Sequence, residues 1–209
     1  INKLNQGERI RSNHYIPKLS ASLSKEFSVG PYSQVRYANH GGFGAIFKAS
    51  MGHREYGIKV VSDNKLARQE IDIWNLISEV PGVPKLFEYR VGQKSASGSV
   101  NILTMEWVSG RNLYELRDSM TPGDLFTSVK SAFETVNKIH EKGIVHGDIK
   151  SKNIMFDKKR GKTTILDFGE SKNFDVSSSS GRELVSKDYD MMERLVNSFE
   201  ERLSIDQRR

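Results

Sequence analysis

Two short stretches in the second half of the chain contain the side chains best suited to chemistry. "HGDIKSKN" contains Asp148, Lys150 and Asn153, and "TTILDFGES" places Asp167 at the end of a strand-like run. Carboxylates and an amide held close together suit a proton acceptor beside a divalent cation. Mg²⁺ takes a few such oxygen ligands and shares its other positions with phosphate and water. A lone loop carboxylate is usually only solvated, so these residues indicate such a site only when further motifs accompany them.

A glycine-rich stretch, "NHGGFGAIFKA", occupies residues 39–49. One interpretation is a tight β-hairpin, because glycine accepts positive φ at the least cost. The other is a backbone stripped of side chains so that a bulky anionic ligand can approach it. Taken alone, the stretch favours the hairpin, since isolated glycine motifs match by accident.

Composition excludes several classes of function. The 209 residues contain no cysteine, which rules out disulfides, thiolate metal sites and a cysteine nucleophile in this sequence. The net charge of +6 suits phosphate-bearing ligands but is too diffuse to indicate nucleic acid. No run approaches the roughly 18 apolar residues that cross a bilayer. The first residue is Ile1, so a natural start or targeting segment could precede it.

Residue patterns predict strands first and helices later. Residues 64–77 have helical spacing, with Leu66, Glu70 and Ile73 on one side and Ile71, Trp74 and Ile77 beside it. A second helix is expected from Asp124, as a possible cap, to Lys142, with a buried stripe of Leu125, Val129, Phe133, Val136 and Ile139. A last amphipathic helix is expected at 188–203. The expected strands are 35–38, 45–49, 55–61, 84–92, 99–108, 153–157 and 163–168.

This order predicts an α+β, two-lobed fold. The N-terminal lobe, 35–108, holds a five-stranded antiparallel sheet and one helix, and the reduced C-terminal lobe, 109–209, is mostly helical. Residues 1–34 are expected to form an N-terminal extension. Loops are expected at 93–98 and at the serine run 177–180, and the basic run 158–162 is expected to be a solvated turn.

The glycines and the third strand resemble motifs of the protein kinase family, which the chain resembles over about 35–200. "YGIK" resembles the family's V-A-I-K, so Lys59 would bind the α- and β-phosphates of ATP. Glu70 lies where the family keeps the glutamate that orients this lysine. The glycine-rich loop would close over the phosphates, and the residues implied there are Gly41, Gly42, Phe43, Gly44 and Ile46.

The remaining motifs follow in the family's order. "HGDIKSKN" resembles H-R-D-L-x-x-x-x-N, so Asp148 would orient the substrate hydroxyl and Asn153 would bind a metal. Lys150 would contact the transferring phosphoryl group and indicates Ser/Thr specificity. "DFG" makes Asp167 the main metal ligand. "MEWV" resembles the hinge, where the backbones of Glu106 and Val108 would bind adenine.

Departures from the family pattern are also informative. Asn39 replaces the first loop glycine, Gly147 replaces the arginine before the catalytic aspartate, and no A-P-E motif follows "DFG". Asp188 is expected to be buried under the catalytic loop and to cap its amides, or to act as a helix N-cap. His146 is expected to be structural, and Trp74 to link its helix to Phe168.

The resemblance implies ATP and Mg²⁺ as cofactors and a protein substrate. The nearest group is the HopBF family of bacterial effector kinases, which implies a Ser/Thr kinase secreted into host cytoplasm and acting on a host protein, the ninety-kilodalton heat-shock chaperone being the candidate. Otherwise a cytoplasmic location is expected. The chain is expected to be a monomer that binds neither nucleic acid nor membrane. The alternatives are a small atypical kinase or ATPase of the KEOPS type, a nucleotide-binding pseudokinase and, less favoured, a small-molecule kinase.

Overall fold

The computed structural model describes residues 32–41, 44–95 and 98–206. The chain divides into two compact units, and its path crosses between them three times. The first unit contains the residues up to Ile71 together with Lys85–Trp107, and the second contains Asp72–Pro84 and Val108–Arg209. Each unit has its own buried core.

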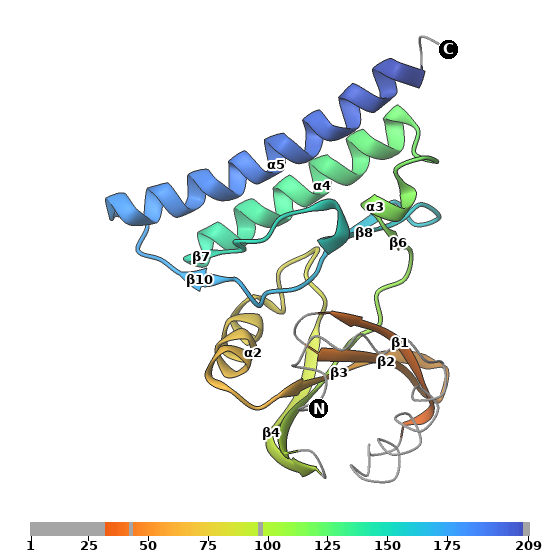
Figure 1. The fold of residues 1–209 in the computed structure, drawn as a ribbon, viewed down its shortest axis with the longest axis vertical. Coiled ribbons are helices and arrows are strands. Elements are labelled where there is room, and N and C mark those ends of the chain that lie inside the picture. The colour runs from red at the N-terminus through yellow and green to blue at the C-terminus, as the bar shows by residue number, and fades with distance from the viewer. Residues whose placement is uncertain (1–31, 42–43, 96–97, 207–209) are drawn as a thin grey trace. The chain divides into compact units, whose positions relative to one another are not determined.

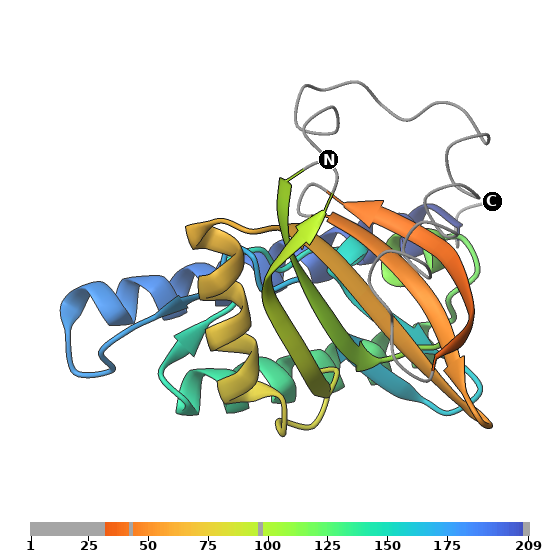
Figure 2. The same cartoon turned by 90° about the horizontal axis from the view of Figure 1, so that it is seen from below.

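The first unit is built on a five-stranded antiparallel sheet, whose strands lie side by side in Figure 2. Because successive side chains of a strand point to opposite faces, the strand register places Phe47, Ile58 and Ile102 on one face, where they form the core of this unit. The strand order is β1-β2-β3-β5-β4. The bounds are β1 Ser33–Gly41, β2 Gly44–Met51, β3 Arg54–Ser62, β4 Leu86–Ser95 and β5 Gly98–Glu106.

Helix α2, Lys65–Ile77, follows β3 and begins where Asn64 accepts a hydrogen bond from the backbone N–H of Ala67 (2.9 Å). Ile71, Ile73, Trp74 and Ile77 are buried as expected. Leu66 is 63% exposed, although helical spacing places it on the same side as Glu70 and Ile73. Leu66 belongs to the first helical turn, which comes before the buried isoleucines and tryptophan of this helix. Periodicity alone does not show at which residue burial begins.

The second unit combines two short sheets with two long helices. Strands β6, β8 and β9 form one sheet, and β7 pairs with β10. The bounds are β6 Arg111–Asn112, α3 Leu113–Leu116, α4 Pro122–Glu141, β7 Ile144–Val145, the 3₁₀ turn η1 Ser151–Asn153, β8 Ile154–Asp157, β9 Lys162–Ile165, β10 Lys172–Asn173 and α5 Ser179–Asp206.

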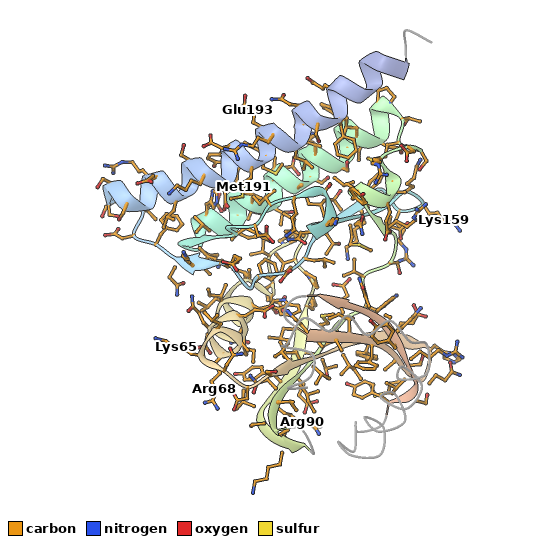
Figure 3. All side chains as sticks on the ribbon, in the orientation of Figure 1. Lys65, Arg68, Arg90, Lys159, Met191 and Glu193 are labelled. Carbon is orange, nitrogen blue, oxygen red and sulfur yellow. The ribbon has the colours of Figure 1, made fainter. Side chains whose placement is uncertain are left out.

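Helices α4 and α5 run side by side and cover the core of the second unit (Figure 1). Met191 of α5 packs against this core, whereas Glu193 is exposed on the outer side of the helix (Figure 3). Phe133 is 43% exposed and stacks on Tyr189, with ring centroids 5.5 Å apart. Its predicted place in the buried stripe of α4 is therefore wrong, because an aromatic partner on α5 holds it at the surface.

Two loop predictions are wrong in part. Pairing of β4 with β5 continues through Gln93, Lys94 and Ser95, so this half of the expected loop is strand. Helix α5 begins at Ser179, nine residues before the expected start at Asp188, and so includes part of the serine run. The architecture itself, a five-stranded antiparallel sheet with one helix followed by a mostly helical part, is confirmed as α+β. Among the described residues, no helix is both long and apolar enough to span a membrane.

Helix α4 begins with a capping box rather than with the expected Asp124 cap. Thr121 is the N-cap, and its hydroxyl accepts a hydrogen bond from Asp124 N (3.1 Å). The carboxylate of Asp124 in turn accepts one from Thr121 N (3.0 Å). Each side chain therefore satisfies a backbone donor that the helix leaves open.

We expect Thr121→Ala to lower the free energy of unfolding by about 1 kcal/mol, because the capping hydrogen bond is lost. Urea denaturation measures this change. Thr127→Ala, at an exposed position inside the same helix, is the control and should be neutral or slightly stabilising. Equal effects of the two variants would contradict the capping assignment.

Candidate active site

Lys59 on β3 forms a buried ion pair with Glu70 on α2, both within the first unit. The two side chains are almost fully buried, at 9% and 3% exposure. A buried charge is stable only when it is paired, and removing one partner of such a pair typically costs about 3–5 kcal/mol. The ion pair therefore fixes the position of α2 against β3 at this point, and it holds the ammonium group of Lys59 in place.

The strand register shows what surrounds Lys59. Ile46 on β2 and Leu103 on β5 lie directly opposite it, so the three side chains share one face of the sheet. Gly57 and Met105 form the next pair on that face. A Cβ atom added to Gly57 would lie 2.8 Å from Met105 Cε, so the methionine fills the space that glycine leaves.

The glycine-rich stretch joins β1 to β2 as a hairpin. Gly41 pairs with Gly44, while Gly42 and Phe43 lie outside the described residues. Gly44 has φ +146°, and a Cβ there would lie 2.3 Å from the carbonyl oxygen of Val60. Close packing on β3 therefore requires glycine at this position. This supports the hairpin interpretation and leaves phosphate binding as a prediction.

The predicted adenine contacts divide between the units. Glu106 ends β5 in the first unit, where its N–H donates to Lys85 O (2.8 Å), and Val108 begins the longer of the two segments that form the second unit. Trp107 lies between Glu106 and Val108 in the sequence. The ammonium of Lys48 lies over its ring, 5.0 Å from the ring centroid.

The loop after β7 brings together two predicted catalytic residues, Asp148 and Lys150, and the predicted metal ligand Asn153. Asn153 Nδ2 donates to the backbone oxygen and to Oδ2 of Asp148, both at 2.9 Å. Lys150 Nζ also binds Oδ2, at 2.5 Å. Asp148 remains 28% exposed. Its carboxylate is thus fixed by two donors while still reachable from solvent.

Asp167 follows β9 and lies beside this loop, because Leu166 N donates to Asn153 O (2.8 Å). Its φ of 71° is in the left-handed region, which non-glycine residues rarely adopt and which often marks functional sites. Oδ1 of Asp167 is buried and has no hydrogen-bond partner in the described part of the chain. An orphaned carboxylate oxygen of this kind is costly unless a ligand binds it.

Asp188 of α5 is fully buried and fixes the start of the loop after β7, which is the predicted catalytic loop. Its carboxylate accepts hydrogen bonds from His146 N and Gly147 N, both at 2.8 Å, and from His140 Nε2 at 2.9 Å. The predicted role under the loop is confirmed. The N-cap alternative is wrong, because α5 begins at Ser179.

His146 and Gly147 are structural. The fully buried ring of His146 donates through Nε2 to Leu166 O (3.1 Å) and accepts from Asp148 N (3.2 Å), which joins the catalytic loop to the stretch before Asp167. Burial lowers the pKa of His146 and keeps the ring neutral. Gly147 has φ +79°, and a Cβ there would lie 2.7 Å from Glu170 O. Any larger residue would push the two backbone segments apart.

The second unit brings together four predicted site residues, Asp148, Lys150, Asn153 and Asp167. The first unit brings together three others, Lys59, Glu70 and Ile46. Among the described residues, no group of three or more Asp, Glu, His or Cys side chains could hold a metal ion. The oxygens of Asn153 and Asp167 are the donors that could hold one there, with phosphate and water completing the shell. Trp74 contacts Phe168 as expected, with ring centroids 5.9 Å apart.

Sequence reasoning missed some residues of the site. His140, the third donor to Asp188, lies on α4, 48 positions away from it in the sequence. Ser171 was also missed, although its hydroxyl donates to His146 O (3.0 Å) and ties the two loops together. Both contacts are tertiary, and no spacing rule of helices or strands predicts them.

Comparison with known proteins gives the class of this chain. The sequence model of the protein kinase domain matches residues 32–204, so the chain belongs to the protein kinase family. It is 27% identical over 183 residues to glycogen synthase kinase 1 from Pyricularia oryzae, covering 82% of this chain and 45% of that protein. It is 30% identical over 175 residues to serine/threonine-protein kinase pim-2 from Danio rerio, covering 72% and 56%. The chain therefore spans about half the length of these two relatives.

A solved structure supports the fold independently of close sequence similarity. The Cydia pomonella Granulovirus kinase, PK-1, matches with a TM-score of 0.60 at 19% identity, covering 75% of this chain and 57% of that chain. At this identity the match shows the fold alone, and it agrees with the sheet and helices described above.

The charge state of Asp188 gives a pH prediction. Burial alone would raise the pKa of this carboxyl, but hydrogen bonds from His140, Gly147 and His146 outweigh it and lower the pKa. The unfolded chain then binds more protons between the native pKa and the ordinary value of about 3.9. The stabilisation is therefore fully present above about pH 4 and decreases as the pH falls through the native pKa.

We expect Asp188→Asn to lower the free energy of unfolding by about 2 kcal/mol at neutral pH, because a charged acceptor of buried N–H groups is lost. The difference from the original protein should shrink as the pH falls below about 4. Urea denaturation across pH measures both effects. Asp190→Asn, two residues along the same helix and exposed, should change stability by less than about 0.5 kcal/mol. A difference for Asp188→Asn that stays constant with pH would contradict this account.

Proposed function

We propose that this chain transfers the terminal phosphoryl group of ATP to a serine or threonine hydroxyl of a protein, with Mg²⁺ as the metal. The observation that carries the proposal is the Asp167 carboxylate. One of its oxygens is buried and has no hydrogen-bond partner among the described residues, its backbone lies in the left-handed region, and it lies beside Asn153. Membership of the protein kinase family supports the reaction class.

Asp148 is proposed to orient the attacking hydroxyl and accept its proton. Lys150 and Asn153 both bind Oδ2, which leaves Oδ1 for the substrate among the described contacts. Because both donors also fix the carboxylate, the hydroxyl meets an acceptor that is already oriented. Lys150 Nζ supplies positive charge at the point where the transferring phosphoryl group would pass, which supports Ser/Thr specificity.

Asn153 and Asp167 are proposed to hold the metal. Nδ2 of Asn153 is used in binding Asp148, so its Oδ1 is the atom that could coordinate a cation. Bound Mg²⁺ would neutralise charge on the phosphate oxygens. Asp167 contributes a carboxylate that is already partly desolvated, so little reorganisation is needed when a cation binds.

Lys59 is proposed to bind the α- and β-phosphates, with Glu70 keeping it extended. The apolar face formed with Ile46 and Leu103 would cover the nucleotide base and sugar. The backbones of Gly41, Gly42, Phe43 and Gly44 are proposed to approach the phosphates, and those of Glu106 and Val108 to bind adenine.

A finer proposal concerns the biological role. The resemblance to HopBF suggests a secreted bacterial effector kinase acting in host cytoplasm, with the ninety-kilodalton heat-shock chaperone as substrate. The support for this role is the sequence resemblance. Incubation with labelled ATP and Mg²⁺ in a eukaryotic lysate tests it. Label on that chaperone would support the role, and label on other proteins alone would contradict it.

The central residue of the proposal is tested with Asp167→Asn. Asparagine tolerates the left-handed backbone that Asp167 adopts, so the fold should persist. Phosphoryl transfer to a protein substrate should fall by at least about a hundredfold, because metal binding supplies several kcal/mol of charge stabilisation. Removal of the metal with EDTA should have the same effect on the original protein.

Glu170→Gln, an exposed carboxylate three residues away, is the matched control and should keep its activity. Urea denaturation should show that both variants fold. Retention of half the activity in Asp167→Asn would rule out the proposed metal site. ATP hydrolysis without transfer to protein would favour the ATPase alternative, and binding without turnover in the original protein would favour a pseudokinase.

A further inference from the structure

Two cationic side chains make cation–π contacts with one exposed aromatic ring beside the catalytic loop. Tyr114 of α3 is 44% exposed, and α3 packs against the turn η1 that contains Lys152. The ammonium of Lys152 lies 5.0 Å from the centroid of this ring, and the guanidinium of Arg117 lies 4.1 Å from it. Two positive charges on one ring repel each other, and salt screens this repulsion over the Debye length of about 8 Å.

The neighbouring cations already have carboxylate partners. Arg111 pairs with Glu115 and Arg117 with Asp118, each at 3.7 Å, and Lys150 pairs with Asp148. Lys152 makes no ion pair within the described part of the chain. Its charge is held in position by the ring of Tyr114 and remains open to solvent.

Lys152 lies close in the sequence to the predicted catalytic residues. It lies two residues after Lys150 and directly before Asn153, on the loop that fixes Asp148. A protein substrate whose hydroxyl reaches Asp148 must bring its neighbouring side chains close to this loop. An anion there would pair with the exposed ammonium of Lys152, whereas a cation would be repelled by it.

We propose that Lys152, supported by Tyr114 and Arg117, binds an anionic side chain of the substrate close to the phosphoacceptor residue. The chemistry is that of a carboxylate or a phosphate, so the preferred substrates are acidic or already phosphorylated near the acceptor. This inference rests on the proposed transfer to protein and adds a substrate class to it.

The test uses synthetic peptides with one serine in a neutral background. Glutamate, phosphoserine or lysine is placed in turn at positions on either side of the acceptor, and kcat/KM is measured for each. The original protein should prefer a glutamate peptide over the neutral one by up to about fivefold, the upper end of the range for an exposed ion pair. A phosphoserine peptide, with about twice the charge, should be preferred further. A preference for phosphoserine alone would identify phosphate as the anion.

Variants of Lys152 show whether this side chain causes the preference. Lys152→Ala should abolish the preference while leaving kcat/KM for the neutral peptide within about twofold. Lys152→Glu should instead favour the lysine peptide. The preference of the original protein should also weaken as salt is raised, because the site is exposed. Lys159→Ala is the matched control, since Lys159 is exposed in the turn between β8 and β9 (Figure 3) and its loss should leave the preference unchanged.

The outcomes separate this inference from the proposed function. Equal kcat/KM values for acidic, neutral and basic peptides would overturn the anion site while leaving phosphoryl transfer intact. A preference that persists in Lys152→Ala would also overturn it. Absence of transfer to every peptide and to every lysate protein would instead contradict the proposed function.

Discussion

The catalytic loop depends on one buried carboxylate. Asp188 lies inside α5 and receives the backbone N–H groups of His146 and Gly147 together with the ring of His140. Without it, two buried donors of the loop would be unsatisfied, and Asp148 follows directly after them in the chain. A helix that packs on α4 through an apolar stripe thus also sets the geometry of the residues that would do the chemistry.

Site residues that share one loop could be predicted from the sequence. Contacts between residues far apart in the sequence could be predicted only in a few cases. Asp148 and Asn153 share one loop, so their spacing sufficed, whereas the pairing of Lys59 with Glu70 came from a family resemblance. The start of α5 was missed because serine and glycine at 177–181 have weak helix propensity and the apolar period begins later. Thr121 and Asp124 are both good caps, and only the observed reciprocal hydrogen bonds show which one begins the helix.

The predicted nucleotide contacts lie in two compact units, each of which is ordered by its own interactions. In the first, the buried ion pair fixes Lys59 on the sheet. In the second, the hydrogen bond from Leu166 N to Asn153 O holds together the two segments that carry the proposed metal ligands, Asn153 and Asp167. A phosphoryl-transfer enzyme needs both sets on one nucleotide. That one nucleotide contacts both sets is part of the proposed function, and the proposed mechanism depends on it.

The most direct test is a double-mutant cycle on ATP affinity. Calorimetric titration with ATP and Mg²⁺ would compare the original protein with Lys59→Arg, which keeps a cation beside Glu70, with Asp167→Asn, and with the double variant. If one nucleotide contacts both residues, their effects should be coupled by more than about 0.5 kcal/mol, and Mg²⁺ should strengthen binding only where Asp167 is present. Additive effects, together with an unchanged Mg²⁺ dependence in Asp167→Asn, would contradict the account.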